Sequence, residues 1–113
     1  MPKVKCDWTE LLYDAGEDTS SWSVEMHIRP AAGSTPAIAK FTSAAGSLLV
    51  GQTTDRGANY GVAVNASAVQ MTFAPGDYEL DLLRIDGGRK ADLLDGAIPV
   101  LAFILPVTDT GLA

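Results

Sequence analysis

The sequence predicts an all-β sandwich of about seven antiparallel strands with one short helical crossover. Its clearest signal is the run 21–29, in which Trp22, Val24, Met26 and Ile28 alternate with polar residues. A period of two indicates a strand with one buried face, which must pack against a second apolar sheet. Similar short segments recur at roughly ten-residue spacing with turn residues between them. The alternation argues against a parallel sheet, whose strands are apolar on both faces.

The first strand is expected over Lys3 to Trp8, where charged residues alternate with apolar ones, and it continues to Tyr13. Its apolar parity changes at Leu11 and Leu12, which is typical of a β-bulge. The other segments of this half are an acidic turn at 14–18, a loop at 30–36 rich in proline and glycine, and short strands at 37–41 and 47–50.

Two more segments, 59–65 and 77–83, alternate as strands do. The stretch 66–73 between them has helical spacing instead, so one or two helical turns are expected there.

The motif Asp-Gly-Gly-Arg at 86–89 predicts a tight hairpin, because a type I′ turn needs positive φ at both central residues. The return strand is expected over 90–103, with a bulge where the apolar parity shifts from Leu93 to Leu94. Residues 108–113 carry no packing signal and are expected to fray.

Composition limits the class of protein. The 113 residues fit one domain, 1–113, which is long enough for a core without staples. A net charge of −6 argues against nucleic acids and anionic membrane surfaces, because like charges repel. No signal peptide or membrane span is expected, so the chain should be made in the cytoplasm. The single cysteine, Cys6, cannot form an internal disulfide, and its parity with Val4 and Trp8 favours burial.

No residue pattern predicts catalysis, so we expect no enzyme, no cofactor and no metal. The single histidine, His27, falls on the polar face of its strand, and no nucleophile elbow or phosphate-binding loop is present. Asp77, Glu79 and Asp81 share a strand face, but strand geometry points them outward in parallel rather than toward one cation.

Several motifs occur in a characteristic order and cover nearly the whole chain. They are Asp7-Trp8, the strand 22–29 ending in Ile28-Arg29, Pro75-Gly76-Asp77-Tyr78 followed by Leu80-Asp81-Leu82, the 86–89 hairpin, and Leu94-Asp95-Gly96-Ala97-Ile98-Pro99-Val100. In this order the chain resembles a group of small proteins encoded in the structural regions of tailed bacteriophages and prophages. The leucine-threonine-glycine that usually precedes the second strand is Thr19-Ser20-Ser21 here, which leaves the core pattern unchanged.

The resemblance implies an immunoglobulin-like β-sandwich that is a non-enzymatic structural component of the virion. Such a component would belong to the tail, the baseplate, a fibre attachment or the capsid decoration. The implied partners are other virion proteins and further copies of the chain, and the implied location is the virion.

The C-terminal segment is more apolar than the last strand of a small domain requires. Its candidate interface residues are Leu101, Phe103, Ile104, Leu105 and Val107. Excess apolar surface near a terminus indicates a partner surface or a strand added to a neighbour. A long, buried final strand explains the same residues equally well.

The alternative function is a small-ligand or carbohydrate-binding β-sandwich module. It would require an aromatic platform, and Trp8 and Trp22 are the candidates. Both lie on apolar strand faces, which favours core packing over ligand binding.

Overall fold

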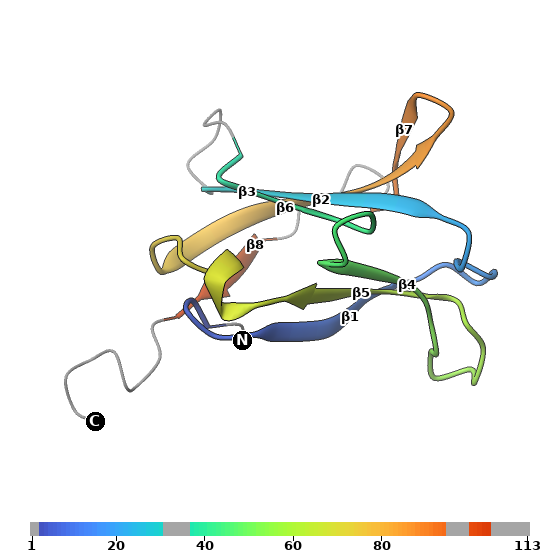
Figure 1. Ribbon diagram of the computed structural model, residues 1–113, viewed down its shortest axis with the longest axis horizontal. Coiled ribbons are helices and arrows are strands. Elements are labelled where there is room, and N and C mark those ends of the chain that lie inside the picture. The colour runs from blue at the N-terminus through green and yellow to red at the C-terminus, as the bar shows by residue number, and fades with distance from the viewer. Residues whose placement is uncertain (1–2, 31–36, 95–99, 105–113) are drawn as a thin grey trace.

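Two antiparallel sheets pack face to face in the computed structural model, which describes residues 3–30, 37–94 and 100–104 (Figure 1). The expected all-β sandwich is confirmed. One sheet has three strands in the order β1-β5-β4, and the other has five, ordered β3-β2-β6 with both β7 and β8 paired to β6. The strands are β1 (Trp8–Asp14), β2 (Ser23–Pro30), β3 (Ala39–Thr42), β4 (Leu48–Gln52), β5 (Gly61–Ala66), β6 (Gly76–Asp86), β7 (Arg89–Asp92) and β8 (Val100–Phe103).

The pair β2 and β6 forms the centre of the five-stranded sheet, with Ser23 opposite Ile85 and Pro30 opposite Tyr78. The inward side chains of β2 are the predicted ones, and Ile28 is completely buried. Leu80 and Leu82 of β6 lie on the same inner face and are also buried. The period-two pattern therefore identified this face correctly.

The three-stranded sheet contributes the opposite wall of the core. Val62 and Val64 of β5 are completely buried. The expected bulge in β1 is confirmed, because the register with β5 shifts between Leu11 and Tyr13. The bulge leaves Leu12 and Tyr13 both packed against the core, whereas the side chain of Leu11 is exposed.

Phe103 of β8 lies at the centre of an aromatic cluster. Its ring centroid is 5.3 Å from that of Trp8, 5.0 Å from that of Phe73 and 5.5 Å from that of Tyr78, all in edge-to-face geometry. Aromatic pairs in this geometry each contribute about 1 kcal/mol beyond the area they bury. The cluster connects β8 and β6 of one sheet to β1 of the other.

The hairpin at 86–89 and the crossover are confirmed. Gly87 and Gly88 have φ of 57° and 88°, the left-handed conformation that the turn requires. The crossover is a single 3-10 turn at Ala68–Gln70, closed by a hydrogen bond of 2.9 Å from Ser67 N to Gln70 Oε1.

Two strand predictions were wrong. The segment before Trp8 is not a strand, because Lys5 adopts a left-handed backbone with φ of 60° and Lys3 makes an isolated bridge to Ile104. Cys6 is accordingly half-buried rather than part of the core. The return strand is two strands, β7 and β8, which pair with successive stretches of β6 and are interrupted by a turn at Leu93 and Leu94. Most of the loop expected at 30–36 and the frayed segment 108–113 lie outside the described residues.

Thr19 connects the loop before β2 to the three-stranded sheet through hydrogen bonds. Its side chain is completely buried, and its hydroxyl donates a hydrogen bond to the carbonyl of Gly61 at 2.8 Å and accepts one from the amide of Gly51 at 2.8 Å. Gly51 must be glycine, because its φ is +66° and a Cβ would lie 2.6 Å from Ser20 Oγ. The loop therefore approaches the sheet closely enough for one hydroxyl to bridge β4 and β5.

Replacing Thr19 with valine should keep the shape of this contact and remove both hydrogen bonds. We expect the free energy of unfolding in urea to fall by about 2 kcal/mol, because two buried backbone groups lose their partner. Thr53→Val, at an exposed position, is the control and should change stability by less than about 0.5 kcal/mol. Equal stabilities of the two variants would contradict this role of Thr19.

Candidate functional site

The three-stranded sheet faces a sheet that is four strands wide at each level, because β7 and β8 pair with successive stretches of the same edge of β6. We call the side of the sandwich at β1 the open side, because a cavity lies beside that strand. Strand β1 is the edge of the smaller sheet, and it pairs with β5 on one side only. No strand of the described residues pairs with its other side. Alternate residues of such an edge turn their backbone N–H and C=O groups away from the sheet. These groups are available to a further strand.

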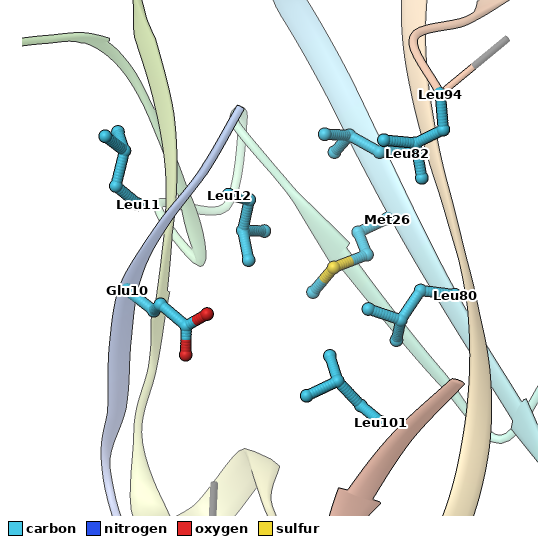
Figure 2. Close-up of a pocket in the computed structure, with 8 residues that line it drawn as sticks. All are labelled: Glu10, Leu11, Leu12, Met26, Leu80, Leu82, Leu94 and Leu101. Carbon is cyan, nitrogen blue, oxygen red and sulfur yellow. The ribbon is translucent and has the colours of Figure 1, made fainter. Parts of the chain in front are cut away.

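A cavity of about 290 Å³ lies between the two sheets directly beside this edge. Figure 2 shows Glu10 and Leu12 of β1 on one side of the space and leucines of the five-stranded sheet on the other. The lining residues are Glu10, Leu11, Leu12, Met26, Leu80, Leu82, Leu94 and Leu101. Seven of these eight side chains are apolar, so the cavity suits an apolar group.

Glu10 is the one charged residue of the lining. Its carboxylate accepts a hydrogen bond of 3.2 Å from the indole Nε1 of Trp8. Among the described residues, no lysine, arginine or histidine forms an ion pair with it, whereas Asp14 at the end of the same strand pairs with Arg56 at 3.6 Å. The mouth of the cavity thus carries a negative charge that forms no ion pair with a described residue.

The predicted C-terminal interface residues divide between the core and the surface. Phe103 is 1% exposed and lies in the aromatic cluster, so its side chain is not available to a partner of the folded domain. Leu101 is half-buried and lines the cavity, and Ile104 is 39% exposed. Leu105 and Val107 lie outside the described residues.

The sequence interpretation did not include Glu10, Leu12 or Leu94 as site residues. One signal for Glu10 was present: it has the same parity as Trp8 and Leu12, which places a carboxylate on the inner face of its strand. An inward-facing charge on a strand is unusual unless the strand lies at an edge.

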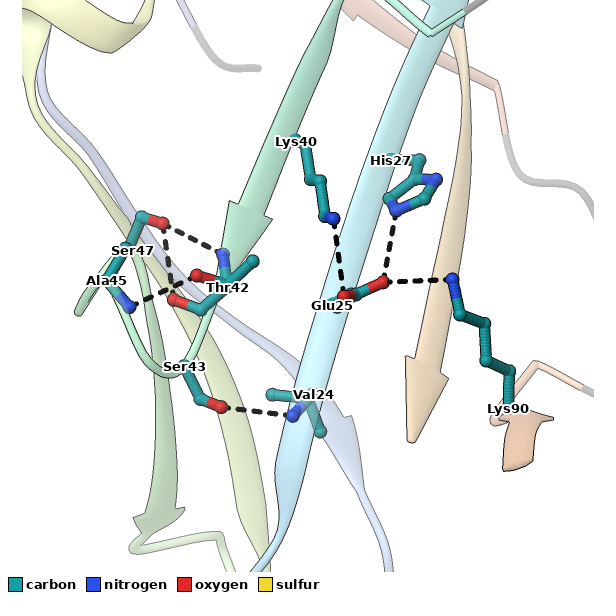
Figure 3. A network of polar contacts seen from close by, with 9 residues as sticks. All are labelled: Val24, Glu25, His27, Lys40, Thr42, Ser43, Ala45, Ser47 and Lys90. Atoms are coloured by element: carbon teal, nitrogen blue, oxygen red, sulfur yellow. Dashed lines mark hydrogen bonds and ion pairs between the residues drawn. The ribbon is translucent and has the colours of Figure 1, made fainter. Parts of the chain in front are cut away.

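The outer face of the five-stranded sheet carries an ion-pair network instead of an apolar surface (Figure 3). The carboxylate of Glu25 lies 3.4 Å from Lys40 Nζ, 3.6 Å from Lys90 Nζ and 3.3 Å from His27 Nε2. The polar partner of His27 is therefore a carboxylate that also pairs with two lysines. Nearby, Arg29 donates two hydrogen bonds to Glu79, at 2.8 and 3.1 Å.

Burial raises the pKa of Glu25, but its contacts with Lys40, Lys90 and His27 together outweigh this effect. The pKa of Glu25 is therefore below its ordinary value of 4.5. The ionised carboxylate is the form that stabilises this face.

The acidic groups and the two tryptophans considered from the sequence can also be placed in the described residues. No set of three acidic, histidine or cysteine side chains lies close enough there to hold a metal ion. Trp8 and Trp22 are 4% and 9% exposed, and the guanidinium of Arg84 lies 4.2 Å from the ring centroid of Trp22. Among the described residues, no helix has the length and apolar character that crossing a membrane requires.

Comparison with known proteins gives no relative for this chain. No family model matches it, and neither a curated protein nor a solved structure is significantly similar to it.

Glu25→Gln should lower the free energy of unfolding at pH 7 by about 1 kcal/mol, because it removes the common partner of three basic groups. The folded-state pKa is depressed, so the stabilisation is present above about pH 4.5 and is lost as the pH falls through the folded pKa. We therefore expect a smaller loss of stability between pH 6 and pH 3 in the variant than in the wild type, measured by urea unfolding. Asp55→Asn, in an exposed loop, is the control. Identical acid profiles for wild type and Glu25→Gln would contradict the assignment.

Proposed function

We propose that the chain is a non-enzymatic structural component of a tailed-bacteriophage virion. It binds other virion proteins through the open side of its sandwich. The observation that supports this most is the edge of β1, which no described strand covers, beside an apolar cavity, since strand edges and apolar clefts are the features that other chains bind.

Two further observations support the proposal. The sequence motifs resemble those of phage structural proteins along nearly the whole chain. The strand that carries much of this resemblance, β2, places its polar residues in a surface network of ion pairs, and its histidine contacts a carboxylate. An assembly role needs stable surfaces of this kind and no reactive group. Multivalent virion positions also allow weak single contacts to act together.

The direct test is mass spectrometry of purified phage particles from a host that carries the gene. The chain should be recovered in particles at a constant ratio to the other structural proteins, and labelled antibodies should decorate one position on each particle. Lysate of uninfected host that produces the chain, run through the same gradient, serves as the control for contamination. A virion role would be rejected if the chain were found only outside the particles.

The cavity also favours a second candidate, a module that binds a small apolar ligand. Its volume of about 290 Å³ is close to the lower end of small-molecule sites. Carbohydrate binding has less support, because it requires an exposed aromatic platform and both tryptophans are buried.

Tryptophan fluorescence tests the carbohydrate-binding alternative. We expect blue-shifted emission, because both indoles are shielded from water, and no change when monosaccharides are added at millimolar concentration. Unfolded protein in urea provides the red-shifted reference. A saturable change in emission with a sugar would contradict this expectation and support the carbohydrate-binding alternative.

A further inference from the structure

We propose that β1 accepts an extended segment of a different, basic protein as a fourth strand of the smaller sheet. The inward side chains of that segment fill the leucine-lined cavity, and one of its basic residues pairs with Glu10. This inference rests on the proposed assembly function and names the type of partner and the site that receives it.

The first argument concerns the backbone. Strand β1 is bonded to β5 along one edge, and no strand of the described residues covers the other edge. The bulge between Leu11 and Tyr13 interrupts the regular ladder, so the regular part of the edge is its N-terminal half, Trp8 to Leu11. An added strand would pair there, beside the mouth of the cavity.

The second argument concerns the side chains. A strand beside β1 would lie over the part of the five-stranded sheet that carries Leu80, Leu82, Leu94 and Leu101. Its residues would alternate between the cavity and solvent, because successive side chains of a strand point to opposite faces. Apolar residues at every second position would therefore enter the cavity, while the residues between them stayed in water.

The third argument is charge, and it selects the partner. Strand β1 contains Glu10 and Asp14 and no basic residue, and the chain has a net charge of −6. Pairing β1 with β1 of a second copy would place two Glu10 carboxylates on neighbouring strands, with no ion-pair partner for either among the described residues, and like charges on neighbouring strands are destabilising. A lysine of a different chain can instead lay its methylene stem along the leucines and place its ammonium group at Glu10.

The test uses two synthetic peptides with the full-length protein. In the first, valine alternates with threonine and one inner valine is replaced by lysine. In the second, the same position is glutamate. We expect the lysine peptide to bind about tenfold more tightly by titration calorimetry, because an opposite charge replaces a like charge across the strand pair. Binding should also slow hydrogen exchange at alternate amides of Trp8 to Leu11.

Two controls connect this binding to the site. Glu10→Gln keeps an acceptor for the Trp8 indole and removes the charge, so it should bind both peptides equally well. Leu94→Ser removes a half-buried leucine from the cavity and should weaken binding at least fivefold. Its matched control is Val69→Ser, at a position that is 80% exposed on the 3-10 turn and outside the cavity lining, and it should bind as wild type does.

Methylation of peptide amides tests the strand itself. A strand bonds to its neighbour through amides of one parity, so methylating that set should abolish binding, and methylating the other set should leave it intact. The proposal would be overturned if methylation of neither set of amides abolished binding. It would also be overturned if exchange protection appeared on β3 instead of β1, or if neither peptide bound at millimolar concentration. The virion experiment tests the assembly function separately, because strand addition in solution does not depend on where the chain is found.

Discussion

The packing around Phe103 is the interaction on which the rest of the structure depends. Its ring contacts Trp8 of the three-stranded sheet and Tyr78 of the five-stranded sheet, so it joins the two layers directly. It also lies next to the point where the first and last described segments meet, since the amide of Val4 donates a 3.0 Å hydrogen bond to the carbonyl of Ile104. One end of the sandwich is therefore closed by residues from the first and last described segments of the chain.

The side of the sandwich at β1 differs from this closed end. The smaller sheet ends at β1 in the described residues, and the larger sheet contributes Met26, Leu80, Leu82 and Leu101 to the cavity beside it. These side chains are apolar, and no strand of the described residues covers the cavity. Glu10 stands at its mouth and keeps the edge acidic. The outer face of β2 differs in character, because its charges are already paired around Glu25 and Arg29. Of these two surfaces, the open side is the one that combines an edge strand with an apolar cavity.

The local sequence pattern was sufficient to predict those elements whose conformation does not depend on tertiary contacts. The strand of Trp22 has one apolar face whatever it packs against, and the Gly87-Gly88 turn requires only its own backbone conformation. The parity change at Leu11 likewise indicated the bulge. The segment before Trp8 shows the limit of this reasoning, because its alternation is as regular as that of a strand. Backbone contacts of Lys5 and Val4 with Met71 and Ile104 hold it in another conformation.

The sequence by itself determined which faces are apolar, because side-chain parity along a strand is a property of the chain alone. It also determined the charge of β1 and the absence of a recognisable catalytic motif. Only the tertiary structure decided the order of the strands, and with it which strand is an edge. That order depends on contacts between residues far apart in sequence, such as β6 with β8 and Trp8 with Phe103. The inward parity of Glu10 could be read from the chain, but its place at the mouth of a cavity required the sheets to be assembled.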